Sequence, residues 1–306
     1  MQAFHSVYEV IMNEPSTISE TGQLAEPLPN RPLHVRTFGL TNQGRVRASN
    51  EDQFFIAEMT KSMKVLHASL PQPKTQRSDE RGYLFIVADG MGGHQAGEQA
   101  SAMAVESIET FALNTLRWFF LLQGTEEHDV LKEFQAALQQ ADAKLCQEAR
   151  QHPELAGMGT TLTIAYCVGS RLFVVHVGDS RCYLLHGSEL QCLTHDHTMV
   201  AELISRGMLQ PEEARHHQFR HVITNAVGGH ELGVKVECHR IELEADDMLL
   251  LCSDGLTEMV PDDHIATVLQ TQRDPREACE RLVAEANDNG GKDNITVIAA
   301  RFDAAS

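Results

Sequence analysis

Hydrophobic and polar positions follow one another along this chain in patterns that predict strands, then paired helices, then strands again. Short apolar runs typical of buried strands lie at 35–40, 53–57, 83–88, 162–168, 171–177, 248–253 and 295–302. Apolar residues recur at every third or fourth position, as on one face of a helix, in 95–113 and 126–150. Further helices are predicted at 261–270 and 275–287. Gly169-Ser170 and the segment 186–188 each separate two strand runs by a hairpin turn.

The order of these elements predicts the fold class. Strands that pair as hairpins and helices that come in pairs favour an α+β sandwich, with sheets inside and helices outside, over alternating β-α-β winding. Residues 1–34 are rich in Pro, Ser, Thr and Glu without an apolar period, so we predict a flexible tail before one folded domain at 35–303. The polar segment 60–82 within that domain is interpreted as a long exposed loop.

Composition narrows the class of protein. A chain of 306 residues with 42% hydrophobic and 22% charged positions can bury a sizeable core. Its net charge of −18 disfavours nucleic acid and anionic membranes as partners. The apolar runs are too short to span a bilayer, and the N-terminus lacks the pattern of a signal peptide. The seven cysteines form no CxxC pair, which favours reduced thiols in a cytoplasmic protein.

Carboxylates stand beside glycines near the ends of several apolar runs, hundreds of residues apart. They are Asp89, Asp179, Asp254 and Asp293. A strand end fixes the direction of its side chain, and the glycine lets the backbone turn sharply. If these carboxylates converged, they would repel one another without a counter-charge. An oxygen-only set favours Mg²⁺, Mn²⁺ or Ca²⁺ over zinc.

Neighbouring residues extend this set toward phosphoester chemistry. Glu51 and Asp52 supply two more carboxylates, and Gly90 leaves a backbone carbonyl free to face a metal. The set exceeds what one octahedral ion needs, whereas two ions would activate a bridging water for in-line attack on phosphorus. Arg47 is suited to bind a phosphate dianion through two N–H groups. These residues predict hydrolysis of a phosphate monoester.

Six blocks of residues, taken in order, carry a family resemblance. They are RASNED (47–52), DGMGGH (89–94), GTT (159–161), GDSR (178–181), SDGL (253–256) and KDN (292–294). The blocks resemble the metal-dependent serine/threonine protein phosphatases of type 2C, the PPM family, over about residues 35–302. Met91 in the second block is similar to bacterial rather than eukaryotic members. The resemblance implies a four-layer αββα sandwich, in which two central antiparallel sheets are flanked by helix pairs.

The resemblance also implies a role for each site residue. Two Mn²⁺ or Mg²⁺ ions would activate a bridging water or hydroxide, and Asp89 would bind both ions. Asp254 and Asp293 would hold the first ion, whereas the Gly90 carbonyl and, through water, Glu51 would hold the second. Asp52 would assist the ligands of the second ion, and Asn294 would orient the ligands. Asp179 would hold a third and weaker ion together with Asp254. Arg47 would bind the substrate phosphate.

One departure from the family pattern concerns the general acid. Eukaryotic members place a histidine directly after the Asp-Gly pair, where it is proposed to protonate the leaving alcohol. Met91 takes that place here, and His94 follows three residues later. His94 is a candidate general acid, because the pKa of an imidazole suits the task. A structural role for His94, with a metal-bound water as the acid, is the alternative.

Three functions fit the sequence. The first is a phosphatase that acts on phosphoserine and phosphothreonine of proteins, which the resemblance implies are substrates of eukaryotic-type serine/threonine kinases, and we expect it to be a monomer. The others are a silent member that binds phosphorylated partners and a small-molecule phosphatase. Thr160 and Thr161 are interpreted as a tight turn rather than as nucleophiles. The histidines at 195, 197, 216 and 217 lack zinc-site spacing and are interpreted as exposed loop residues in a flap beside the site.

Overall fold

The structure, a computed structural model, describes residues 33–64, 75–92, 94–114, 125–214, 217–229 and 233–305. The strands are β1 (Leu33–Asn42), β2 (Asp52–Lys64), β3 (Thr75–Met91), β4 (Gly159–Thr160), β5 (Leu162–Val168), β6 (Arg171–Val177), β7 (Arg181–His186), β8 (Glu189–Cys192), β9 (Glu237–Glu242), β10 (Met248–Cys252) and β11 (Ile295–Ala304). The helices are α1 (His94–Asn114), α2 (Thr125–Gln151), α3 (Met199–Ser205), α4 (Pro211–Ala214), α5 (Asp254–Thr257), α6 (Asp262–Thr271) and α7 (Pro275–Asp288), with a 3-10 turn at Pro153–Leu155.

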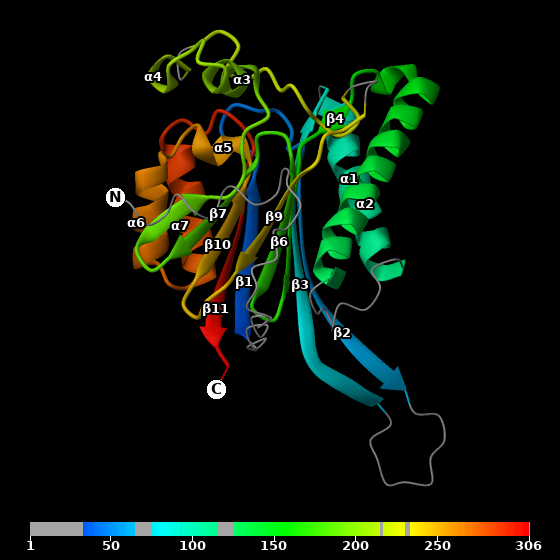
Figure 1. Ribbon diagram of the computed structural model, residues 1–306. Coiled ribbons are helices and arrows are strands. Elements are labelled where there is room, and N and C mark those ends of the chain that lie inside the picture. The colour runs from blue at the N-terminus through cyan, green and yellow to red at the C-terminus, as the bar shows by residue number, and fades with distance from the viewer. Residues whose placement is uncertain are drawn as a thin grey trace, which may run out of the picture.

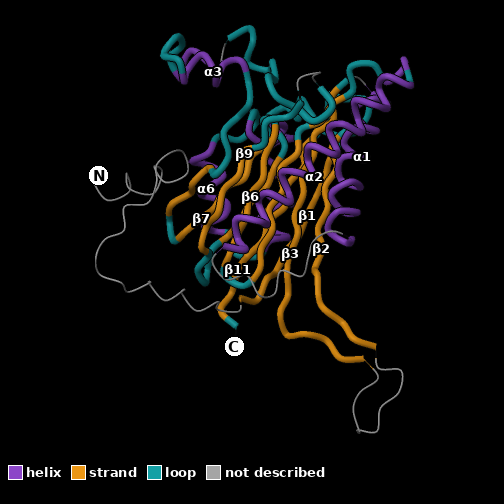
Figure 2. Tube along the Cα trace, turned by 45° about the vertical axis from the view of Figure 1, so that its right-hand side comes forward, coloured by secondary structure: helices purple, strands orange, loops and turns teal. Residues whose placement is uncertain are grey.

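Two antiparallel sheets lie face to face in the centre of the molecule. One has the strand order β1-β11-β10-β7-β8, and the other has the order β2-β3-β5-β6-β9, with β4 pairing with the end of β3. The helices α1 and α2 cover the second sheet, and α6 and α7 cover the first (Figure 1). Figure 2 shows the same layers from another side. The predicted four-layer α+β sandwich is therefore confirmed.

Three apolar cores hold these layers together. Side chains such as Phe85, Leu251 and Phe302 fill the space between the two sheets. Phe134 of α2 belongs to the core between the second sheet and its helices, and Leu282 of α7 belongs to the core on the first sheet. Because β5, β6 and β10 are covered on both faces, every residue of these strands is buried. This explains why they are continuous apolar runs in the sequence rather than alternating ones.

The predicted helices and hairpins agree with the structure to within a few residues. The hairpin of β5 and β6 turns at Gly169, and that of β7 and β8 turns at Gly187, both with φ of 59°. Glycine readily adopts this positive φ, which explains why a glycine between two strand runs correctly predicted each hairpin. All the cysteines are free thiols. Among the described helices none combines the length and apolarity needed to cross a membrane.

The predicted boundaries of the tail and the long loop were wrong. Leu33 and His34, assigned to the tail, begin β1 and pair with Ala304 and Asp303 of β11. The expected loop 60–82 is largely strand, because β2 continues to Lys64 and β3 begins at Thr75. These polar strand ends pair with each other and extend beyond the sandwich (Figure 1). The sequence of these strand ends lacks the apolar alternation that predicts a strand, so the pairing was not predicted. Residues 1–32 and 65–74 lie outside the description.

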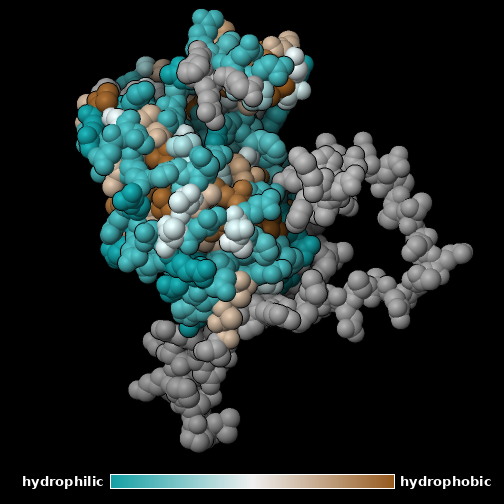
Figure 3. Space-filling view, turned by 90° about the vertical axis from the view of Figure 1, so that its left-hand side faces the viewer, coloured by the Kyte–Doolittle hydropathy of each residue, from teal (hydrophilic) through white to brown (hydrophobic). Residues whose placement is uncertain are grey.

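Between β8 and β9 the chain makes an excursion at 193–236, which we call the flap. It carries α3 and α4 and rises above the end of the two sheets (Figure 1). Thr198 caps α3 by accepting a hydrogen bond from the Ala201 N–H at 3.3 Å. The outer face seen in Figure 3, viewed from the α6 and α7 side, is mostly hydrophilic, in keeping with a solvent-exposed helix layer.

Candidate active site

The acidic residues predicted from the sequence meet at one end of the sandwich, below the flap. Each lies at or near the end of an element: Asp52 begins β2, Asp89 lies near the end of β3, Asp179 follows β6, Asp254 begins α5 and Asp293 precedes β11. The antiparallel order of the strands brings these ends together. A cleft of about 490 Å³ is lined by Arg47, Glu51, Asp89, Gly90, Asp179, Asp254 and Asp293. Residues from five distant stretches of the chain thus form one cleft.

Asp52 lies below this cleft rather than in its lining. It is 3% exposed and is the register partner of Asp89 across β2 and β3. Ser253 Oγ donates a hydrogen bond of 2.7 Å to Asp52 Oδ2 and accepts one of 3.0 Å from the Thr296 N–H. Ser253 therefore ties the carboxylate of one sheet to the backbone of the other. The sequence block 253–256 was recognised, but this contact was not predicted.

Asp89 is fixed by two threonines that the sequence analysis interpreted as a tight turn. Thr160 instead ends β4 and Thr161 directly precedes β5, and Gly159 pairs with Met91 in extended conformation. The Asp89 N–H donates to Thr161 Oγ1 at 3.0 Å, and Thr160 Oγ1 donates to the Asp89 carbonyl at 2.8 Å. The Thr161 N–H donates to the same carbonyl at 2.9 Å. The threonines thus hold the backbone that carries the central carboxylate.

The close packing around Glu51 requires glycine at positions 90 and 97. The Gly90 N–H donates to the Glu51 carbonyl at 3.2 Å, and Ser101 Oγ donates to the same carbonyl at 2.7 Å. A Cβ on Gly97 of α1 would lie 2.1 Å from Glu51 Oε2, and one on Gly90 would lie 2.2 Å from the Gly97 carbonyl. Only glycine lets α1 approach the Glu51 carboxylate this closely. Gly97 and Ser101 are site-shaping residues that the sequence analysis missed.

Asn294 and Arg47 organise the opposite wall. Asn294 Oδ1 accepts the Glu51 N–H at 2.9 Å, while its Nδ2 donates to the Gln43 and Ser49 carbonyls. This holds the loop before β2 in place, as expected for an orienting residue. The Arg47 guanidinium donates to Asp293 Oδ2 at 2.6 Å and its side chain is 52% exposed. Its remaining N–H groups are therefore within reach of a ligand in the cleft.

The electrostatics of the site call for positive charge. Burial, followed by repulsion from the neighbouring carboxylates, raises the pKa of Asp89 and of Asp254 well above the ordinary value. Burial also raises the pKa of Asp52 to about 6 and that of Asp179 to about 7. The Oδ1 atoms of Asp52, Asp179 and Asp254 are buried, and none of them has a hydrogen-bond partner among the described residues. Buried oxygens of this kind fit divalent cations, which prefer carboxylate and carbonyl ligands.

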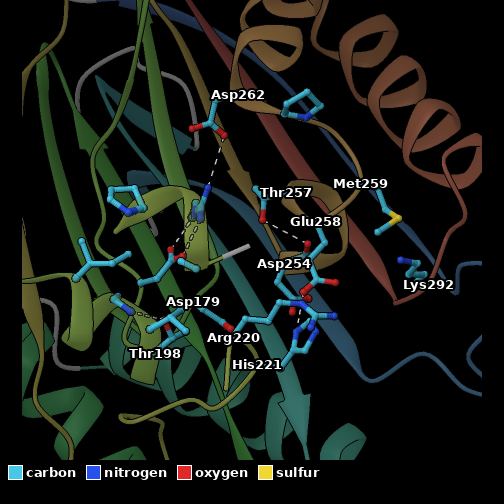
Figure 4. A pocket seen from close by; sticks show the side chains of 18 of the residues that line it. Asp179, Thr198, Arg220, His221, Asp254, Thr257, Glu258, Met259, Asp262 and Lys292 are labelled. Atoms are coloured by element: carbon cyan, nitrogen blue, oxygen red, sulfur yellow. Dashed lines mark hydrogen bonds and ion pairs between the residues drawn. The ribbon is translucent and has the colours of Figure 1, made fainter. Parts of the chain in front are cut away.

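A second, larger hollow opens beside the cleft and shares its floor. It has a volume of about 1240 Å³ and lies between the flap and the segment of α5 and α6. Figure 4 shows Arg220 and His221 of the flap close to Asp254 and Glu258. His221 Nδ1 lies 2.7 Å from Glu258 Oε1, and Lys292 lines both hollows. These residues were not predicted, because no pattern in the sequence links the flap to α5.

The histidines considered in the sequence analysis differ in position and exposure in the structure. His94 begins α1, directly after Met91 and Gly92 of the cleft lining, but its side chain is outside the description. His195 is exposed, as predicted, whereas His197 is only 21% exposed and accepts the Gly178 N–H at 3.0 Å. The prediction of an exposed loop was therefore wrong for His197, because its ring is packed beside His176. His216 lies outside the described residues.

Comparisons with known proteins agree with this geometry. The family described as Protein phosphatase 2C matches residues 72–293. The serine/threonine phosphatase stp of Listeria welshimeri is 36% identical over 258 residues, covering 84% of this chain and 92% of that protein. The structure of the S. agalactiae serine/threonine phosphatase has a TM-score of 0.74 at 31% identity and covers 88% of this chain and 99% of that one.

A further solved structure contains metal. The catalytic domain of the serine/threonine protein phosphatase PstP, in complex with 2 manganese ions, has a TM-score of 0.68 at 34% identity. It covers 89% of this chain and 99% of that one. The length of the family match, the identity to the Listeria protein and the shared fold lead to one conclusion: the chain belongs to the protein phosphatase 2C family of metal-dependent serine/threonine phosphatases.

Proposed function

We propose that the cleft below the flap hydrolyses phosphoserine and phosphothreonine of proteins, with its carboxylates as ligands of Mn²⁺ or Mg²⁺. The observation that carries this proposal is the set of buried carboxylate oxygens on Asp52, Asp179 and Asp254, near Asp89, which have no hydrogen-bond partner in the described part of the chain. A metal-free site of this charge is unfavourable, whereas two divalent cations would neutralise it. Two such ions, when bound, activate water as a nucleophile and neutralise charge on the phosphoryl oxygens.

Each acidic residue of the site has a proposed role in metal binding. Asp89 would hold both ions, as the family pattern implies for this lining residue of the cleft. Asp254 and Asp293 would hold one ion, and the Gly90 carbonyl and, through water, Glu51 would hold the other. Asp179 would hold a third ion with Asp254, as the family pattern implies; the two carboxylates are close, since repulsion from Asp179 is the largest cause, after burial, of the raised pKa of Asp254. The buried Asp52 supports this shell from below through Ser253.

Arg47 binds the substrate phosphate in this proposal. The Arg47 guanidinium donates a hydrogen bond to Asp293, and this bond orients the guanidinium before a substrate binds. A planar guanidinium matches two phosphate oxygens at once, which a lysine does not. His94 protonates the leaving serine or threonine oxygen. Its position at the start of α1, three residues after Met91, supports this role.

The shape of the site favours a protein over a small phosphorylated molecule. Pockets for small ligands have volumes of roughly 300–1,000 Å³. Here the cleft of about 490 Å³ shares Asp179, Arg220 and His221 with the hollow of about 1240 Å³ under the flap. Together they offer room for the residues that flank a phosphorylated side chain. A silent, binding-only member is disfavoured, because every metal ligand of the family pattern is present.

The finer assignments rest on the family. We propose that the substrates are products of eukaryotic-type serine/threonine kinases, and that the protein acts in signalling in the cytoplasm as a monomer. Its net charge of −18 speaks against nucleic acid as a partner. We also propose that residues 33–304 form the catalytic domain and that the preceding segment is not needed for turnover.

A comparison of substrates tests this proposal. The value of kcat/KM is measured with Mn²⁺ for phosphothreonine peptides of ten or more residues and for phosphorylated sugars and nucleotides. We expect the peptides to be preferred by at least about 10-fold, corresponding to about 1.4 kcal/mol of transition-state binding from flanking residues. Equal or better turnover of the small phosphate esters would contradict a protein substrate and support the small-molecule alternative.

A further inference from the structure

A second cluster of metal-ligating side chains lies at the base of the flap and shares no residue with the lining of the cleft. Four imidazoles surround the Glu237 carboxylate. They belong to His176 of β6, His195 and His197 of the loop after β8, and His239 of β9. Nothing in the phosphatase chemistry uses these residues. The sequence analysis rejected a zinc site at His195 and His197 on spacing, and it did not connect them with Glu237 and His239, which are separated from His195 by the whole flap.

The two inner histidines are already committed to hydrogen bonds at both nitrogens. His176 Nε2 donates to the Gly178 carbonyl at 3.0 Å, so its Nδ1 accepts from Thr163 Oγ1 at 2.9 Å. Burial lowers the pKa of His176 to about 4, so the ring is neutral. His197 Nδ1 accepts the Gly178 N–H, which places the His197 proton on Nε2, 3.4 Å from Glu237 Oε2. Neither ring has a free lone pair for a metal.

The two outer histidines are different, because both direct a nitrogen to one carboxylate oxygen. His195 Nδ1 lies 2.8 Å from Glu237 Oε1, and His239 Nε2 lies 2.5 Å from the same atom. Glu237 and His239 are two residues apart on β9, so they extend from the same face of a rigid strand. His195 is 73% exposed, which leaves the site open to solvent and to an entering ion. The inner ring of His197 holds the other carboxylate oxygen in position.

We propose that His195 Nδ1, His239 Nε2 and the Glu237 carboxylate bind a divalent transition metal ion of the zinc class. Two imidazoles and one carboxylate form a ligand set that zinc accepts, with water in the fourth position. Their three ligand atoms lie within 4.8 Å of one another. Metal–ligand distances of about 2.0–2.2 Å in a tetrahedron place ligand atoms about 3.3 Å apart. The two N–O contacts would therefore lengthen by less than about 1 Å.

The imidazole ligands distinguish this site from the catalytic cleft, whose lining carboxylates and carbonyl favour Mn²⁺ or Mg²⁺.

The position of the site gives it a structural consequence. His195 belongs to the chain entering the flap, and Glu237 and His239 belong to β9, where the chain leaves it. An ion bound there would clamp the two ends of the flap together. Asp196, next to His195, forms a two-pronged ion pair with Arg181 at 2.8 and 2.7 Å, close to Asp179 of the cleft. The proposed metal ligand His195 is therefore adjacent in sequence to Asp196, whose ion pair with Arg181 lies beside the catalytic cleft.

Zinc binding to the full chain tests the proposal. Metal-stripped protein in millimolar Mn²⁺ is titrated with Zn²⁺ against a chromophoric chelator, and bound zinc is counted. Because zinc also accepts carboxylate ligands such as those of the cleft, the decisive quantity is the difference between variants. We expect wild-type protein to bind one more zinc ion per chain than His239→Gln or His195→Gln, with a loss of affinity at that site above about 100-fold. Circular dichroism establishes that each variant is folded.

His186→Gln is the matched control. His186 Nδ1 also lies 2.8 Å from a carboxylate, that of Asp247, but this pair belongs to no cluster of metal-ligating side chains among the described residues. This variant should bind as many zinc ions as the wild type. Equal zinc stoichiometry and affinity in wild type, His195→Gln and His239→Gln would overturn the proposal. So would a zinc-edge anomalous map of a Zn²⁺-soaked crystal with density at the carboxylates of the cleft and none at Glu237.

Discussion

Asp52 and Asp89 are direct register partners across the antiparallel strands β2 and β3, with both residues at the catalytic end of the sheet. Like charges placed opposite each other in a sheet are destabilising. Their juxtaposition is retained here because burial and repulsion keep the pKa of Asp89 high, and because a cation can neutralise both carboxylates. The pair explains how a stable sandwich can hold a site with so many buried acids.

Stability of the metal-free protein should decrease as the pH rises. The pKa values of Asp52 and Asp179 are raised from 3.8 to about 6 and about 7 in the folded state. Between about pH 4 and pH 7 the folded protein binds more protons than the unfolded chain, so its free energy of unfolding falls across this window. Urea unfolding in EDTA measures the slope. Saturating Mn²⁺ should remove it, and Asp179→Asn should flatten its upper part. An identical slope in Asp179→Asn would contradict these assignments.

Asp254→Asn should nearly abolish turnover without unfolding the chain. The amide keeps the shape of the side chain but removes the charge proposed to hold two ions, and loss of several kcal/mol of transition-state stabilisation lowers kcat by about 10³-fold or more. Steady-state kinetics with a phosphothreonine peptide give the comparison. Asp288→Asn, at a carboxylate paired with Arg45 on the surface, is the control and should keep wild-type rates. Full activity in Asp254→Asn would exclude the proposed metal arrangement.

Arg47→Ala should mainly raise KM for phosphorylated substrates. Removing charge-assisted hydrogen bonds costs about 1.5–3 kcal/mol, or roughly 10- to 150-fold in binding. Arg45→Ala is a close control, because Arg45 is two residues away, equally charged and paired with Asp288 instead of Asp293. Its KM should match that of the wild type. A KM unchanged in Arg47→Ala, or raised equally in both variants, would argue against phosphate binding by Arg47.

His94→Gln tests the proposed general acid through the leaving group. Threonine oxygen leaves poorly unless it is protonated, whereas p-nitrophenolate leaves readily without a proton. The variant should therefore lose about 100-fold in kcat on a phosphothreonine peptide and much less on p-nitrophenyl phosphate. His221→Gln serves as a comparison at the flap side of the cleft. Equal losses on both substrates would assign His94 a structural role.

The carboxylates at strand ends were predictable because each is marked by a pattern in the neighbouring sequence. An apolar run followed by Asp-Gly marks a buried strand that stops at a turn, as at Asp89 and Asp254, and the family blocks supplied the order. The contacts that position these residues were not predictable in the same way. Thr161 bonds Asp89 from 72 residues away, and Ser253 bonds Asp52 from 201 residues away. Such pairings depend on sheet register, which no single segment encodes.

Two features of the fold escaped the sequence analysis for the same physical reason. The outer parts of β2 and β3 pair with each other beyond the sandwich, and their sequence shows no apolar alternation. The cluster around Glu237 forms only because β9 places Glu237 opposite His176 and returns the chain to His195. Its ligands come from both ends of the flap, and their proximity exists only in the folded chain.

Release of phosphate from a phosphothreonine peptide by the purified protein, measured with Mn²⁺, with Mg²⁺ and with excess EDTA, tests the central claim most directly. The arrangement of Asp89, Asp254 and Asp293 predicts turnover with either metal and its loss in EDTA, restored when the metal is returned. Folded protein that releases no phosphate with either ion, or that works equally well in EDTA, would contradict a metal-dependent phosphatase.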